Sequence, residues 1–108
     1  MHRIVLPTEP TRDELQLTDV LQALSDPVRL GIVLALAYRG DLPCGSFDLH
    51  SPKSTQSHHF RVLRTSGVIS THRDGKELIN TLRRNDLEDR FPGLMTAVLS
   101  AAPPPPIK

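Results

Sequence analysis

The sequence contains no tryptophan, one tyrosine and three phenylalanines among its 108 residues. Leucine, valine, isoleucine and alanine must therefore build the interior, a composition that suits packed helices. A chain of this length forms one small domain with a limited core, so a partner subunit would be a natural supplement.

Cysteine is nearly absent, since Cys44 is the only one and cannot form an internal disulfide. This is consistent with a reducing compartment. No apolar run is long enough to cross a bilayer, and the N-terminus has no signal-peptide pattern. We therefore expect a soluble cytoplasmic protein without membrane association.

Acidic residues are absent from residues 51–67, and the formal net charge of +1 hides an uneven distribution. Residues 51–84 contain seven Lys or Arg and two acidic residues, a net charge of +5. The net charge is −3 for residues 1–50 and −1 for residues 85–108. Segregation of this kind is typical of polyanion binding, the alternative being chance clustering on a small protein.

The acid-free stretch has the end signals of a helix. Ser51 can cap the first turn, Pro52 suits the first helical position, and Gly67 can adopt the left-handed conformation that ends a helix.

The predicted helix has two different faces. His59, Phe60 and Leu63 share one side at helical spacing. Small hydroxyl and amide side chains on the other side can approach base edges, while Arg and Lys can meet phosphates. We therefore predict a DNA recognition helix with these polar residues: Lys53, Ser54, Thr55, Gln56, Ser57, His58, Arg61 and Arg64.

Another helix is expected near the N-terminus. Thr11 and Glu14 have the spacing of a capping box and predict a helix over residues 12–24. Its apolar stripe comprises Leu17, Val20, Leu21 and Leu24.

Two further helical segments precede the recognition helix. Asp26 and Pro27 signal the start of a helix over residues 28–38, which is apolar on most sides and is therefore expected at the centre of the core. Residues 44–49 are expected to form one or two helical turns, the first member of a helix-turn-helix pair.

A hairpin is predicted after the recognition helix. Residues 68–73 and 76–82 are strand-like, and Asp74-Gly75 between them is a strong hairpin signal. Arg73 and Lys76 flank the tip, where they can contact a phosphate backbone or a minor groove. The alternative is a hairpin that only covers the core, but its place after the basic helix favours DNA contact.

The end of the chain predicts an interrupted helix. Asn85 and Glu88 form a cap pattern, and Pro92 should interrupt the helix near Phe91 before a second segment runs to about Ala101.

We expect the first and last helices to form a dimer interface, with intramolecular packing alone as the alternative. The expected domain spans residues 11–101, between an N-terminal arm (1–10, a short extended piece or a loose arm) and a proline-rich tail (102–108) that is extended or disordered. The predicted interface residues are Leu17, Leu21, Phe91, Leu94, Met95, Val98 and Leu99.

The motif Ser54-Thr55-Gln56-Ser57-His58-His59-Phe60-Arg61-Val62-Leu63, followed by Gly67-Val68-Ile69, resembles the recognition helix of the arsenical-resistance repressor (ArsR) family. Residues 24–30 are similar to that family's second-helix entry, and residues 73–76 lie where the family places its wing turn. The resemblance covers about residues 15–100. It implies a mainly α winged helix-turn-helix fold with a small β-hairpin.

The resemblance also implies a homodimer that binds a palindromic operator and is released by an inducer or a metal. By the same resemblance, residues 53–58 face the major groove, Arg61 and Arg64 meet the DNA backbone, and His59 points inward with a structural role.

The expected metal sites of the family are not evident. The family's pair of cysteines is reduced to Cys44 in a shortened segment, and the last helix has no histidine. A zinc site needs three or four suitable ligands, so we predict no metal and no cofactor. An unknown small-molecule effector is the alternative to a metal inducer. For Cys44 the favoured role is a small buried apolar side chain. The alternatives are a metal site shared between subunits and a lone redox switch.

Two other classes of function agree less well with the sequence. A winged-helix interaction module without DNA binding would have acidic or bulky residues on the recognition face, and this face has none. An enzyme is not expected, because no nucleophile has a base and an orienting group at recognisable spacing, and no phosphate-binding glycine loop occurs.

Overall fold

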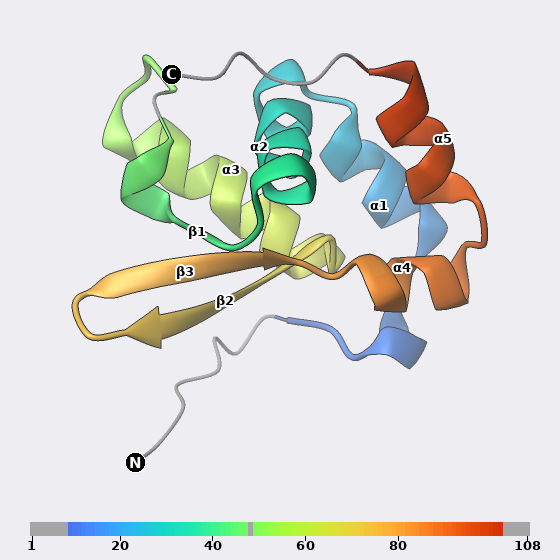
Figure 1. Cartoon of the computed structure of the whole chain (residues 1–108). Coiled ribbons are helices and arrows are strands. Elements are labelled where there is room, and N and C mark those ends of the chain that lie inside the picture. The colour runs from blue at the N-terminus through green and yellow to red at the C-terminus, as the bar shows by residue number, and fades with distance from the viewer. Residues whose placement is uncertain (1–8, 48, 103–108) are drawn as a thin grey trace.

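The computed structural model describes residues 9–47 and 49–102, where helices surround a small antiparallel sheet (Figure 1). The elements are the 3-10 helix η1 (Arg12–Glu14), α1 (Leu17–Leu24), α2 (Pro27–Arg39), β1 (Leu42–Pro43), the 3-10 helix η2 (Cys44–Ser46), α3 (Lys53–Ser66), β2 (Ile69–Asp74), β3 (Glu77–Leu82), α4 (Arg84–Arg90) and α5 (Leu94–Ala101).

Helix α2 is the central element, as its sequence predicts. The Asp26 carboxylate accepts hydrogen bonds from the backbone N–H groups of Val28 (2.9 Å) and Arg29 (3.1 Å), so it caps the helix in front of Pro27. The apolar run at residues 32–36 is buried throughout. This run joins a core to which α1, α3, β2, α4 and α5 also contribute side chains.

The prediction of one continuous helix over residues 12–24 is wrong, because the chain forms two separate helical segments there. The backbone N–H of Thr11 does donate to Glu14 Oε1 at 2.8 Å, as expected of a capping box, but it heads only the 3-10 turn η1. The chain is extended at Leu15 and Gln16 before α1 begins at Leu17. The break lets the Leu15 side chain enter the core, where it is completely buried.

Helix α3 ends as predicted but begins differently. Gly67 is left-handed (φ 85°), and the backbone N–H of Val68 donates to the carbonyl of Leu63 at 3.1 Å. The N-cap is Pro52, with no side-chain cap, and not Ser51. The Ser51 hydroxyl is buried and has no hydrogen-bond partner in the structure.

The hairpin is present, with its loop shifted by one residue. Asp74 pairs with Glu77, so the loop consists of Gly75 and Lys76 and not of Asp74 and Gly75. Gly75 has a φ of 63°, whereas Lys76 does not have a positive φ; this pattern suits a type II′ turn with glycine first.

A third strand was not predicted. Strand β1 pairs with β3, so that the strand order is β1-β3-β2. Strand β1 is only two residues long, so its sequence shows no alternation of apolar and polar residues. Its Pro43 is tolerated because β1 is an edge strand. The segment predicted as a helix over residues 44–49 forms only the 3-10 turn η2 among its described residues.

The C-terminal helix is interrupted where proline predicts. Helix α4 ends at Arg90, with Phe91 as its C-cap, and α5 follows Gly93. The expected cap at Asn85 is wrong, because the N-cap is Arg83 and Asn85 lies inside α4. The second segment starts at Leu94, after Pro92 and the left-handed Gly93. Of the predicted arm and tail, residues 1–8 and 103–108 lie outside the described part.

Gly67→Ala should lower the free energy of unfolding by about 2 to 5 kcal/mol. The left-handed backbone costs an alanine about 1–2 kcal/mol, and a clash in a packed core costs about 1–3 kcal/mol more. A Cβ at this position would overlap Leu15 Cδ2. Gly93→Ala is the matched control, since Gly93 has the same φ of 85° and nothing within 4 Å of an added Cβ. In urea unfolding, Gly93→Ala should lower the free energy of unfolding only by the cost of the left-handed backbone. Equal losses for the two variants would contradict the packing assigned to Leu15.

Candidate nucleic-acid interface

Helix α3 is bound to the core by one face only. His59, Phe60, Leu63 and Ser66 are buried on that face. The opposite face has no acidic residue and is open to solvent; its exposed members are Lys53, Ser54, Thr55, Ser57, His58, Arg61 and Thr65.

Eight of the ten side chains that were predicted to contact DNA are exposed, on α3 and on the hairpin. The remaining two, Gln56 and Arg64, are half-buried. Gln56 Nε2 donates to the carbonyl of Ser51 at 2.6 Å, so this amide secures the chain entering α3. Arg64 Nε is buried and has no hydrogen-bond partner in the structure.

His59 joins α3 to the first turn of α2, which confirms its inward orientation. Its Nδ1 lies 3.3 Å from Arg29 Nη1 and 3.9 Å from Asp26 Oδ2. A guanidinium can only donate, so His59 Nδ1 is the acceptor in this contact. Arg29 also donates from Nε to the carbonyl of Ala23 at 2.8 Å, which ties the end of α1 to the same place.

Sequence reasoning missed this role of Arg29. Its signal was present, because Arg29 is the only charged residue in an otherwise apolar helix before Arg39. A buried or half-buried charge in such a helix needs partners, and here they are the carbonyls that end α1 and the ring of His59.

The hairpin separates charges of opposite sign between its two faces. Arg73 lies opposite Leu78 on the face shared with the buried Thr71. Asp74 and Glu77 oppose each other one position further along, and therefore point to the other face. The N-terminal end of α3 and the hairpin tip lie on the same side of the molecule, at the left of Figure 1.

A buried asparagine holds the base of the hairpin. Asn80 Oδ1 accepts from the Thr71 hydroxyl at 2.8 Å, and its Nδ2 lies 3.2 Å from both the carbonyl of Leu42 and Cys44 Sγ. Cys44 is half-buried against this amide. Within residues 9–47 and 49–102, no group of three or more His, Cys, Asp or Glu residues could hold a metal ion.

The predicted dimer residues differ in what they expose. Leu17 and Leu21 are each 45% exposed on α1. Phe91, Leu94, Val98 and Leu99 are half-buried. Met95 is 0% exposed within its own chain, so its assignment to an interface is wrong: it is a core residue with no surface left for a partner.

In the described part of the chain, no single helix is long and apolar enough to cross a membrane; α1 and α2 have the required length and composition only as a pair bent by 99°.

Asp26→Ala should lower the free energy of unfolding at neutral pH by about 1 kcal/mol through loss of the N-cap. The hydrogen bond from the Arg29 backbone N–H lowers the pKa of Asp26 below its ordinary value of 3.8. A carboxyl whose pKa is lowered on folding contributes stability above its unfolded pKa, and this contribution is lost as the pH falls through the folded value. The variant should therefore approach the original protein in urea unfolding well below pH 3.8.

Asp41→Ala is the control for this prediction, because Asp41 is exposed and has no hydrogen bond or ion pair in the structure. It should change little at either pH. A deficit of Asp26→Ala that stays constant from neutral to acidic pH would contradict the role given to the carboxylate.

Comparison with known proteins identifies the fold. No model of a known family matches the chain. The chain is 33% identical over 79 residues to the HTH-type transcriptional regulator YceK of Bacillus subtilis (strain 168), covering 70% of this chain and 79% of that protein. It is 36% identical over 75 residues to the transcriptional repressor SdpR of the same organism, covering 68% and 82%.

A solved structure agrees with these relatives. The crystal structure of RHA00566, an ArsR family transcriptional regulator, matches with a TM-score of 0.59 and 25% identity, over 81% of this chain and 98% of that one. All three are named as transcriptional regulators or repressors, which agrees with the expectation of no enzymatic activity. The chain belongs to the ArsR family of winged helix-turn-helix transcriptional regulators.

Proposed function

We propose that the protein is a homodimeric transcriptional repressor that binds a palindromic operator through α3 and the β2–β3 hairpin. The observation that carries the proposal is the acid-free, exposed face of α3. SdpR, a relative of this protein, is named a transcriptional repressor, which supports repression as the outcome of DNA binding.

The order of side chains along α3 suits a helix that enters a major groove. Ser54, Thr55, Ser57 and His58 are exposed in its first half, where short polar groups can approach base edges. Arg61 is exposed further along, where a guanidinium can meet a phosphate. Gln56 is assigned a smaller part in reading bases than the sequence suggested, because its amide N–H is used by the carbonyl of Ser51.

The charges elsewhere favour the same orientation. Arg73 and Lys76 are exposed near the hairpin tip, on the side of the molecule that carries the start of α3 (Figure 1). Exposed acidic residues are most numerous on other elements: Asp13 and Glu14 on η1, Asp19 on α1, and Glu88 and Asp89 on α4. The hairpin has Asp74 and Glu77 on the face opposite that of Arg73. A duplex is therefore attracted to the α3 side and repelled from the opposite elements.

The apolar surface of α1 supports a dimer. Leu17 and Leu21 are exposed about one helical turn apart on α1, so their apolar side chains are accessible to a partner subunit. A twofold-symmetric dimer presents two copies of α3, so its preferred site should contain two inverted half-sites.

Selection of bound duplexes from a random pool tests the proposal. It should enrich a sequence with two inverted half-sites whose centres are about one helical turn, roughly 10 base pairs, or a multiple of this apart. A pool that shows no enrichment would refute DNA recognition and favour an interaction module. An enriched site without symmetry would refute the dimeric arrangement.

Arg61→Gln should weaken operator binding and reduce the slope of log affinity against log salt by about one unit per lost phosphate contact, hence about two per dimer. Gel-shift titrations at several salt concentrations measure this slope. Arg39→Gln removes the same charge from the exposed end of α2 and should leave the slope unchanged. If the two variants behave alike, Arg61 has no specific contact with the DNA backbone.

Leu21→Lys should convert the dimer to a folded monomer, because the new charge would be buried without a partner at the interface. Sedimentation equilibrium measures the mass, and circular dichroism checks the fold. Gln22→Lys is the control, since Gln22 is exposed on a different side of α1. A dimer that persists in Leu21→Lys would show that α1 does not contribute to the interface.

A further inference from the structure

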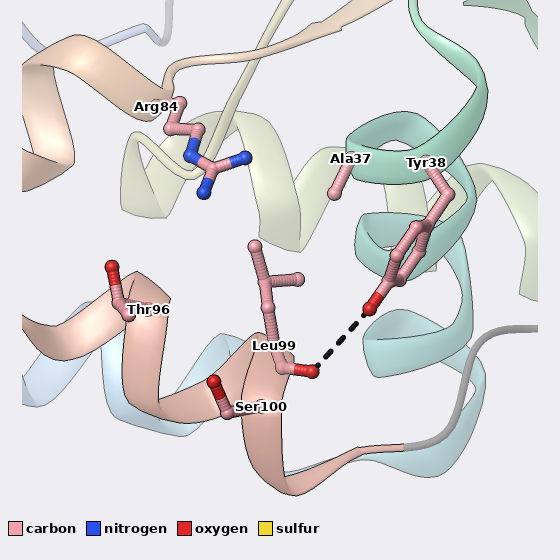
Figure 2. A pocket seen from close by; sticks show the side chains of 6 residues that line it. All are labelled: Ala37, Tyr38, Arg84, Thr96, Leu99 and Ser100. Carbon is pink, nitrogen blue, oxygen red and sulfur yellow. Dashed lines mark hydrogen bonds between the residues drawn. The ribbon is translucent and has the colours of Figure 1, made fainter.

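We propose that a hollow between α2, α4 and α5 is a binding site for a small organic carboxylate, held by the guanidinium of Arg84 and the hydroxyl of Tyr38. The hollow has a volume of about 220 Å³ and is shown in Figure 2. Its lining residues are Ala37, Tyr38, Arg84, Thr96, Leu99 and Ser100.

Arg84 differs from the arginines around it in having no structural role. Arg83 binds Asp86 at 3.0 Å and the carbonyl of Pro10 at 2.6 Å, and Arg90 donates to the carbonyl of Leu15 at 2.7 Å. Arg84 is exposed, and the structure gives it no hydrogen bond or ion pair. A cation in the first turn of a helix also gains nothing from the helix dipole. The side chain is therefore free to bind a ligand, and it points into the hollow (Figure 2).

The other polar groups of the hollow are also available to a ligand. The Tyr38 hydroxyl lies 3.5 Å from the carbonyl of Leu99, a long hydrogen bond that a charged acceptor would readily replace. The hydroxyls of Thr96 and Ser100 have no hydrogen bond in the structure. No acidic residue lines the hollow, so its net charge is positive and attracts an anion.

The apolar lining and the volume define the rest of the ligand. Leu99, Ala37 and the ring of Tyr38 supply the apolar part of a lining whose accessible surface is mostly polar. A carboxylate on one ring or on a short branched chain fits these limits, with two parallel bonds from Arg84 to its oxygens.

Helix α5, which provides Thr96, Leu99 and Ser100 to the hollow, lies at the opposite end of the molecule from the hairpin tip (Figure 1). The hollow is therefore separate from the proposed DNA surface, so loss of benzoate binding and loss of operator binding are distinguishable. It shares only Leu99 with the predicted dimer residues.

Titration of the ¹⁵N-labelled full chain with benzoate, followed by two-dimensional NMR, tests the site. Saturable shifts should centre on the backbone amides of Tyr38, Arg84 and Leu99 and on the Arg84 side chain. Benzamide has the same shape without the charge and should bind at least about tenfold more weakly, because it loses the charge-assisted pair. Inorganic phosphate should also bind more weakly, since it lacks an apolar body. Absence of saturable shifts, or equal affinity for benzoate and benzamide, would overturn the proposal.

Arg84→Gln should weaken benzoate binding by about tenfold or more, and Tyr38→Phe by a smaller factor. Arg39→Gln is the matched control, because Arg39 is an exposed arginine next to Tyr38 that does not line the hollow. Its affinity for benzoate should equal that of the original protein. If Arg84→Gln binds benzoate as well as Arg39→Gln does, the site assignment is wrong.

Discussion

The attachment of α3 to the core by a single face is the constraint on which the remaining structure depends. Phe60 and Leu63 fill the interior, and His59 reaches the capped start of α2 through Arg29 and Asp26. A helix buried along one face must display the other, and this other face contains hydroxyl, amide and basic groups without a carboxylate. The left-handed turn at Gly67 then sends the chain directly into β2, so the same turn also positions the hairpin.

The hairpin is held at its base and free at its tip, and this division suits a wing. Asn80 connects Thr71 with the carbonyl of Leu42, so the short strand β1 stabilises the inner half of the sheet. The loop at Gly75 and Lys76 extends beyond these contacts, and both of its residues are exposed. The predicted DNA surface thus combines a helix fixed by core packing with a hairpin fixed at one end.

The sequence predicts the parts that local chemistry determines and misses those that tertiary packing decides. The capped helix α2, the left-handed end of α3 and the break before Pro92 all follow from residues that impose their backbone conformation. The break at Leu15 does not, because it arises from a side chain that enters the core beside a glycine 52 positions later in the sequence. Likewise, periodicity gave Met95 an apolar position but could not tell an internal core from a subunit interface. For the candidate site, the acid-free face was evident from composition, whereas the support given by Arg29 depends on contacts between α1, α2 and α3.

The most direct test of this account is to map the contact surface on the protein itself. Backbone amide shifts would be measured by NMR while the ¹⁵N-labelled chain is titrated with its selected duplex. The largest changes are predicted over the first half of α3 and at the hairpin loop, with Phe60 and Leu63 remaining packed in the core. Changes concentrated on α4 or the start of η1, with α3 unaffected, would contradict the claim that core packing turns this helix toward DNA.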